Sequence, residues 1–185
     1  DGFDAIPFFT SLEKARVPAG ITAKIVPLRG RQFLELTQGA TVMLNPNDSG
    51  CVLYPEEVSA LLQRGVVARV EKLAFEVEAP FLVMEEANPP VRLLVALKAL
   101  YEGLAFVDVA YVLRVATPEH PDHPAYLIVI GVAPENAERA ARGTITQVQS
   151  AVAEAELSLD LTVFDPAHGL PEYLSHKGVE RFFGP

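Results

Sequence analysis

The second half of the chain constrains the fold most, because strand and helix patterns alternate there in a legible order. Apolar residues alternate or run continuously in the strand-like segments and recur at three- and four-residue steps in the helix-like ones. The segments are a strand, a helix, two strands, a second helix and a final strand, at residues 80–85, 88–103, 106–116, 125–133, 134–156 and 157–165. This order is that of a split βαβ, ferredoxin-like domain.

The ends of the two helices carry their own signals. Asn88 is a residue type that caps helices, and Pro90 suits the first turn, so the first helix is expected to begin there. Gly143 and Thr144 interrupt the second helical pattern, which predicts a break or kink.

The first half also mixes strands and helices. Strands are expected at 6–11, 22–28 and 66–77, and a helix over 55–65 is marked by Pro55 at its start and Gly65 at its end. We therefore expect an α/β (α+β) protein of two small modules, residues 1–79 and 80–185, with the boundary near Glu78-Ala79-Pro80.

Charge and composition limit the kinds of partner that the protein is expected to bind. The 24 acidic and 15 basic residues give a formal charge of −9. This balance argues against nucleic acid, which is bound through Lys and Arg, and against an anionic membrane surface. Cys51 is the single cysteine, so no internal disulfide forms. No apolar run reaches the roughly 18–20 residues that span a bilayer, and no secretory signal is visible. We expect a bacterial, cytoplasmic protein.

The polar turn at 45–50 is the strongest candidate binding site. It follows a buried-type strand and precedes a helix start, a place where backbone N–H groups often meet an anion. Its residues are Asn45, Asn47, Asp48, Ser49 and Gly50. The alternative is a plain turn whose residue types are set by backbone conformation.

The His120-Pro-Asp-His123 segment is the strongest candidate metal site. Zinc needs three or four converging ligands, and His120 and His123 with Asp122 would supply three, as in a metal-assisted hydrolase. Pro121 and Pro124 instead favour a stiff, solvent-facing loop over 117–124. We favour the loop, and expect neither metal nor cofactor.

Other features argue against catalysis. Acidic neighbours would raise the pKa of the Cys51 thiol, and Glu85 and Glu86 would point to opposite faces of a strand. No nucleophile elbow, His-Glu-x-x-His helix or Gly-rich dinucleotide fingerprint occurs in the sequence.

Several stretches resemble a known family. The runs PFFTSLE, VPLRGRQFLELTQGATVMLNP and LYPEEVSALL resemble the N-terminal domain of the SseB ("enhanced serine sensitivity") family, and ALKALYEGLAFVDVAYVLRV and LTVFDP resemble its C-terminal domain. The resemblance supplies no catalytic residues and no cofactor. By elimination, because no catalytic constellation is present, we expect a non-enzymatic protein that presents a sheet edge or groove to a protein partner or to itself. The alternative, which the serine label of the family suggests, is a small-ligand (amino-acid) sensor.

Overall fold

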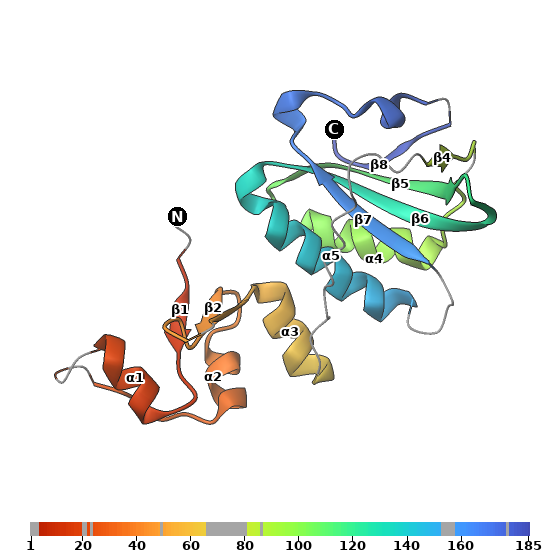
Figure 1. The fold of residues 1–185 in the computed structure, drawn as a ribbon. Helices are drawn as coiled ribbons and strands as arrows, with labels where there is room; N and C mark the ends of the chain where they lie inside the picture. Colours follow the sequence, from red (N-terminus) through yellow and green to blue (C-terminus); the bar gives the residue numbers. More distant parts are fainter. Residues whose placement is uncertain are drawn as a thin grey trace. The chain divides into compact units, whose positions relative to one another are not determined.

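Two compact units, Asp1–Val67 and Ala68–Pro185, make up the chain in the computed structural model (Figure 1). The structure describes residues 4–19, 22, 24–48, 50–65, 81–85, 87–152, 158–176 and 178–185. The expected boundary near Glu78-Ala79-Pro80, the expected strand at 66–77 and the candidate residue Ser49 lie outside the described residues. Helices combined with mixed sheets confirm the α+β class.

Over its described residues, the first unit is a small three-stranded sheet with three helices. Its elements are β1 (Ile6–Phe8), α1 (Leu12–Ala19), α2 (Gly30–Leu36), β2 (Val42–Leu44), β3 (Cys51–Leu53) and α3 (Pro55–Arg64). The central strand β2 is parallel to β1 and antiparallel to β3. Leu34, Val42 and Val58 form the buried core, beside the stacked rings of Phe8 and Phe33. Because few residues are buried in this core, the stability of the unit also depends on contacts outside it.

The helix α3 begins and ends as the sequence predicts. Pro55 occupies its first turn, and the buried carboxylate of Glu57 accepts a hydrogen bond from the Tyr54 N–H at 2.9 Å. Gly65 ends the helix at φ 75°, where its N–H donates to the Leu61 carbonyl. A left-handed residue at this position favours glycine.

The strand expected at 22–28 is wrong. Residues 24–28 form no strand, and Val26 and Leu28 are largely exposed. An alternating segment becomes a strand by pairing and burying one face, and these apolar side chains gain no such burial.

The second unit is built on a larger sheet. Its elements are β4 (Leu82–Val83), α4 (Val91–Glu102), β5 (Val107–Thr117), β6 (His120–Val132), η1 (Pro134–Asn136), α5 (Ala137–Val152), β7 (Leu159–Phe164), η2 (Pro166–His168), η3 (Glu172–Ser175) and β8 (Arg181–Phe183). The strand order is β4-β5-β6-β7, and β8 also pairs with β5. The pairing is antiparallel except between β6 and β7, which are parallel.

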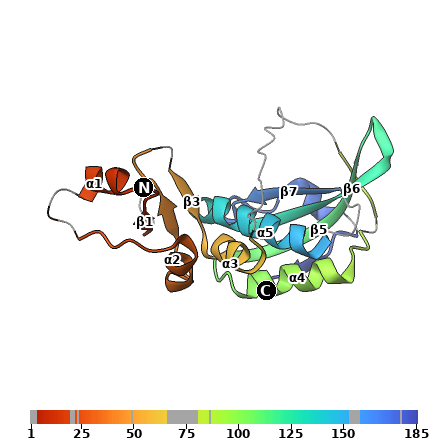
Figure 2. The same ribbon diagram turned by 90° about the horizontal axis from the view of Figure 1, so that it is seen from below.

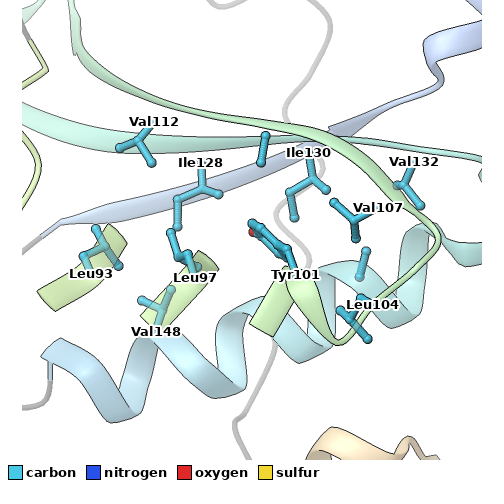
Figure 3. Close-up of a cluster of buried hydrophobic side chains, with 12 residues drawn as sticks. Leu93, Leu97, Tyr101, Leu104, Val107, Val112, Ile128, Ile130, Val132 and Val148 are labelled. Carbon is cyan, nitrogen blue, oxygen red and sulfur yellow. The ribbon is translucent and has the colours of Figure 1, made fainter. Parts of the chain in front are cut away.

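Both faces of this sheet are covered within the unit. In Figure 1, α4 and α5 lie against one face and the segment from η2 to η3 lies against the other; Figure 2 shows the two helices side by side. Alternate residues serve the two faces. Figure 3 shows Leu93, Leu97 and Tyr101 of α4 packed against Ile128 and Ile130 of β6. Leu113, Val129 and Leu174 lie in the cluster on the opposite face.

The predicted order of elements in this unit is confirmed, but the ferredoxin-like strand arrangement is not. A split βαβ unit holds another strand between the two parallel strands that a helix joins. Here β6 and β7, joined by α5, are direct neighbours, and β4 and β5, joined by α4, are antiparallel. Helix-linked strands therefore pair directly throughout this sheet.

Two local predictions about the helices also fail. The helix α4 begins at Val91 with Pro90 as its N-cap, and Asn88 instead adopts φ 42°. The helix α5 runs through Gly143 and Thr144 without a break. Packing of α5 against α4, including the contact between Thr144 and Tyr101, outweighs the weak helix propensity of these residues. Among the described residues, no helix has the length and apolarity needed to cross a bilayer.

Candidate functional site

Asn45 ties the predicted binding turn to the first strand. Its Oδ1 accepts a hydrogen bond from the Thr10 N–H at 3.0 Å, and its Nδ2 donates to the Thr10 hydroxyl at 3.2 Å. Its own N–H donates to the Phe8 carbonyl at 2.8 Å. The residue is buried and holds φ 43°, a left-handed conformation that Asn tolerates better than most residues. The side chain therefore fixes the turn to β1.

Asp48 lies on the exposed side of the same turn. Its carboxylate accepts a hydrogen bond from Lys14 Nζ on α1 at 2.6 Å. This hydrogen bond, together with the positive charge of Lys14, lowers the pKa of Asp48. A hollow of about 120 Å³ opens beside the pair, lined by Phe9, Lys14, Val17, Asn45, Asn47 and Asp48.

Gly50 closes the turn for a steric reason. A Cβ at this position would lie 3.0 Å from Met43 Cε and 3.2 Å from Pro46 Cα. Contacts this short with backbone leave little room for a side chain. The close approach of the chain to itself therefore favours glycine at this position.

The polar groups of this turn already serve the fold. Asn45 bonds Thr10, Asp48 bonds Lys14, and the carboxylate of Glu57 lies at the start of α3, where an anion was expected. A ligand in the hollow would compete with Lys14 for Asp48. The turn remains a predicted binding site, and it lies beside the hydrogen bonds that join Asn45 to Thr10 and Asp48 to Lys14.

The histidine segment is a strand where a loop was expected. Residues 120–124 belong to β6, and a tight turn at Pro118 and Glu119 joins it to β5, so the predicted loop over 117–124 is wrong. The segment extends a long hairpin with exposed side chains. The ring centroids of His120 and His123 lie 6.5 Å apart. The two rings alone supply two of the three or four ligands that zinc needs, and no third ligand from the described residues joins them.

Other candidate ligands are dispersed through the described part of the chain. No group of three or more His, Cys, Asp or Glu side chains suited to a metal occurs within it. His168 lies on the surface, with its Nδ1 2.9 Å from Asp165 Oδ2. Cys51 begins β3, and its side chain is exposed.

The feature that sequence reasoning missed is the outer edge of β7. Within the described residues, β7 has β6 on one side and no strand on the other. The Ser158 carbonyl accepts a hydrogen bond from the Tyr126 N–H, so backbone groups of Ser158 point toward β6. Backbone groups alternate in direction along a strand. Those of Leu159, Leu161 and Val163 therefore point outward from the sheet.

A groove runs along this edge, between β7 and α5. It measures about 250 Å³ and is lined by Ile128, Thr144, Ile145, Val148, Gln149, Leu159, Asp160 and Leu161. Leu159 and Leu161 lie on the helix-covered face of the sheet, in register with Tyr126 and Ile128 of β6. An open strand edge thus lies next to a mostly apolar groove. The alternation of residues 157–165 could reveal the strand but not its position in the sheet.

A buried pair of hydroxyl groups lies at the inner wall of the groove. Tyr101 Oη is 3.0 Å from Thr144 Oγ1, and the tyrosine is almost fully buried. Burial raises the pKa of Tyr101, because the interior disfavours the phenolate. The pair is a neutral, structural hydrogen bond between α4 and α5.

Comparison with known proteins identifies relatives for both units. Residues 1–60 match the family model described as the SseB protein N-terminal domain, and residues 76–182 match the SseB protein C-terminal domain. Proteins named Protein SseB from Escherichia coli (strain K12) and Shigella flexneri are each 28% identical over 120 residues, covering 64% of this chain and 46% of each relative. The matched region therefore spans about half the length of these relatives. No solved structure matches.

Proposed function

This chain belongs to the SseB family, and we propose that it acts without catalysis, as an accessory module that binds an extended segment of protein. The observation that carries the proposal is the outer edge of β7 with the apolar groove beside it. An added strand would take up the outward backbone groups of β7, the mode called β-augmentation. Its alternate side chains would enter the groove and supply specificity.

The chemistry of the edge defines the segment that it accepts. Side chains of the bound segment that lie on the helix-covered face would meet Ile145, Val148 and Leu161, and so should be apolar. Those on the other face would meet the exposed Asp160, where a neutral or basic side chain suits better than a carboxylate. The expected motif alternates apolar and polar residues and places no carboxylate opposite Asp160.

Selection from a displayed library of random peptides tests this proposal. Enriched peptides should alternate, and should slow hydrogen exchange at the amides of Leu159, Leu161 and Val163. Val163→Lys, which puts a charge on the edge, should abolish binding, while the control Val95→Lys on the exposed face of α4 should not. Protection confined to other elements, or turnover of a substrate by the purified chain, would contradict the proposal.

A sensor of small amino acids is the second candidate, favoured by the hollow beside Asp48 and its mixed polar lining. A ligand at about 100 times its Kd stabilises the folded state by about 2.7 kcal/mol, which moves the melting temperature by several degrees. Thermal-shift measurements with serine and other amino acids test it. A shift that is lost in Asp48→Asn would favour the sensor, and unchanged melting across the amino acids would contradict it.

A further inference from the structure

We propose that the segment bound by β7 is the β7 strand of a second copy, so that two chains pair antiparallel about a two-fold axis at Leu161. This inference rests on the proposed function, since it names the partner of the same edge. It follows from three properties of β7: its sparse edge protection, the direction of its backbone groups and its side-chain pattern.

Within the described residues, the edge of β7 has little of the usual protection against pairing. Natural edge strands are blunted by charged residues (Lys above all), Pro, bulges, short length or a covering helix or loop, and of these β7 itself carries only the charge of Asp160. The sequence of β7, LDLTVF, contains neither Lys nor Pro, and its register with β6 is unbroken over residues 159–164. The outer edge of β5, in contrast, pairs with the short strands β4 and β8. A six-residue edge with so few such devices is suited to pairing.

The backbone fixes which registers are possible. Antiparallel strands bond where outward-pointing residues stand opposite each other. With the axis at Leu161, that residue faces its own copy, and Leu159 faces Val163 of the second chain. Each of these residues then exchanges both backbone hydrogen bonds, giving about six across the interface.

The side chains select this register among the alternatives. The axis at Leu161 places leucine and valine against each other on the helix-covered face, and Asp160 opposite Thr162 on the other. An axis at Asp160 would oppose two carboxylates, which is destabilising. An axis at Thr162 would set Asp160 opposite Phe164 and leave Leu159 beyond the paired strand. A shift by one residue in the pairing would bring polar side chains to the apolar face.

The side chains of the second copy would extend the partly exposed apolar row of β7. Val163 is 36% exposed, and Leu159 and Leu161 are half-buried, so this row is incompletely covered within one chain. In the paired arrangement the same row of the second chain extends the apolar face beside α5. Both copies gain this cover equally, as a two-fold, isologous interface requires.

A charge-swap series on the full chain tests the register. Sedimentation equilibrium should show a monomer–dimer equilibrium for the native sequence. Thr162→Glu opposes Asp160 of the second copy at two symmetric positions, and should weaken the dimer by roughly 2- to 30-fold. Adding Asp160→Lys to Thr162→Glu converts both repulsions into attractions, and should restore the native dimer. Val163→Lys, a second variant on a more exposed position, should also weaken it, whereas Val95→Lys on α4 should not.

Hydrogen exchange gives an independent readout. Amides of Leu159, Leu161 and Val163 should become protected as the concentration rises, while those of Asp160 and Thr162 remain unchanged. A chain that stays monomeric, or a dimer insensitive to both Thr162→Glu and Val163→Lys, overturns the inference. If the monomeric chain still binds selected peptides at β7, the proposed function stands without self-pairing. If β7 is protected by neither peptides nor concentration, both proposals fail.

Discussion

Substitutions of Asn45 separate two contributions of this residue to the stability of the first unit, namely its side-chain hydrogen bonds and its positive φ. The side chain bonds both the N–H and the hydroxyl of Thr10, and the backbone holds φ 43°. Asn45→Gly removes the side-chain bonds but adopts positive φ freely, so it should cost about 0.5–1.5 kcal/mol, the net worth of a hydrogen bond whose N–H water can reach. Asn45→Ala adds a left-handed penalty of about 1–2 kcal/mol, partly offset because glycine loses about 0.5–1 kcal/mol more entropy on folding. Alanine should therefore be the worse substitution by about 1 kcal/mol.

Urea unfolding followed by NMR signals from β2 and α3 measures this unit by itself. The Thr10 amide should exchange faster in both variants, by about tenfold for each 1.4 kcal/mol of local stability lost. Asn47→Ala, a substitution in the same turn, serves as the control. The reasoning fails if Asn45→Ala costs less than about 0.5 kcal/mol, the range of ordinary surface substitutions. Equal values for alanine and glycine would refute the part that concerns positive φ.

Three other substitutions test the packing and charges of the two units. Gly131→Ala places a Cβ 2.5 Å from Val109 Cγ1 and 2.9 Å from Phe164 Cζ, and overpacking should cost about 1–3 kcal/mol in thermal unfolding; an unchanged melting temperature would show that both side chains move aside freely. Lys14→Met should return the pKa of Asp48 to its ordinary range in an NMR titration. Because the pKa is lowered in the folded state, the ion pair contributes stability above the unfolded pKa, near 3.8, and loses it as pH falls through the folded value; an unchanged pKa in Lys14→Met would remove Lys14 as the cause. Tyr101→Phe leaves a threonine hydroxyl without its tyrosine partner, and should cost about 1–3 kcal/mol by calorimetry; a neutral result would indicate that the hydroxyl finds another acceptor.

Local signals in the sequence predicted those elements whose ends are set by nearby residues. The helix α3 is the clearest case, because Pro55 and Gly65 act through their own backbone conformations. The strands β5 and β6 were predicted from alternation and burial. At residues 120–124, however, two prolines suggested a loop where β6 continues. Pairing of Thr117 with His120 shows that the hairpin sets the conformation there.

Strand neighbours depend on contacts that no local pattern encodes. The element order of the second unit fits both a ferredoxin-like arrangement of strands and the observed one. In the observed arrangement, strands that a helix links are direct neighbours. The candidate binding turn also depends on contacts between residues far apart in the sequence. The types of the turn residues pointed to a ligand, but Thr10 and Lys14, which engage them, lie 34–35 residues away in sequence. Sequence reasoning had no means to pair these groups.

The two outer edges of the larger sheet differ in whether other strands cover them, and both proposals rest on this difference. The edge of β5 is covered by β4 near one end and by β8 near the other. The strand β8 is integral to the unit, because the ring of Phe183 lies 5.5 Å from that of Tyr101 and a Cβ on Gly184 would clash with the Asp108 carbonyl. The chain thus covers one edge with β4 and β8. The described residues provide no such cover for β7, whose outward groups and apolar row match those of its own copy. This contrast, between an edge covered by two short strands and an edge without a described neighbour, is the observation on which the proposed pairing at β7 rests.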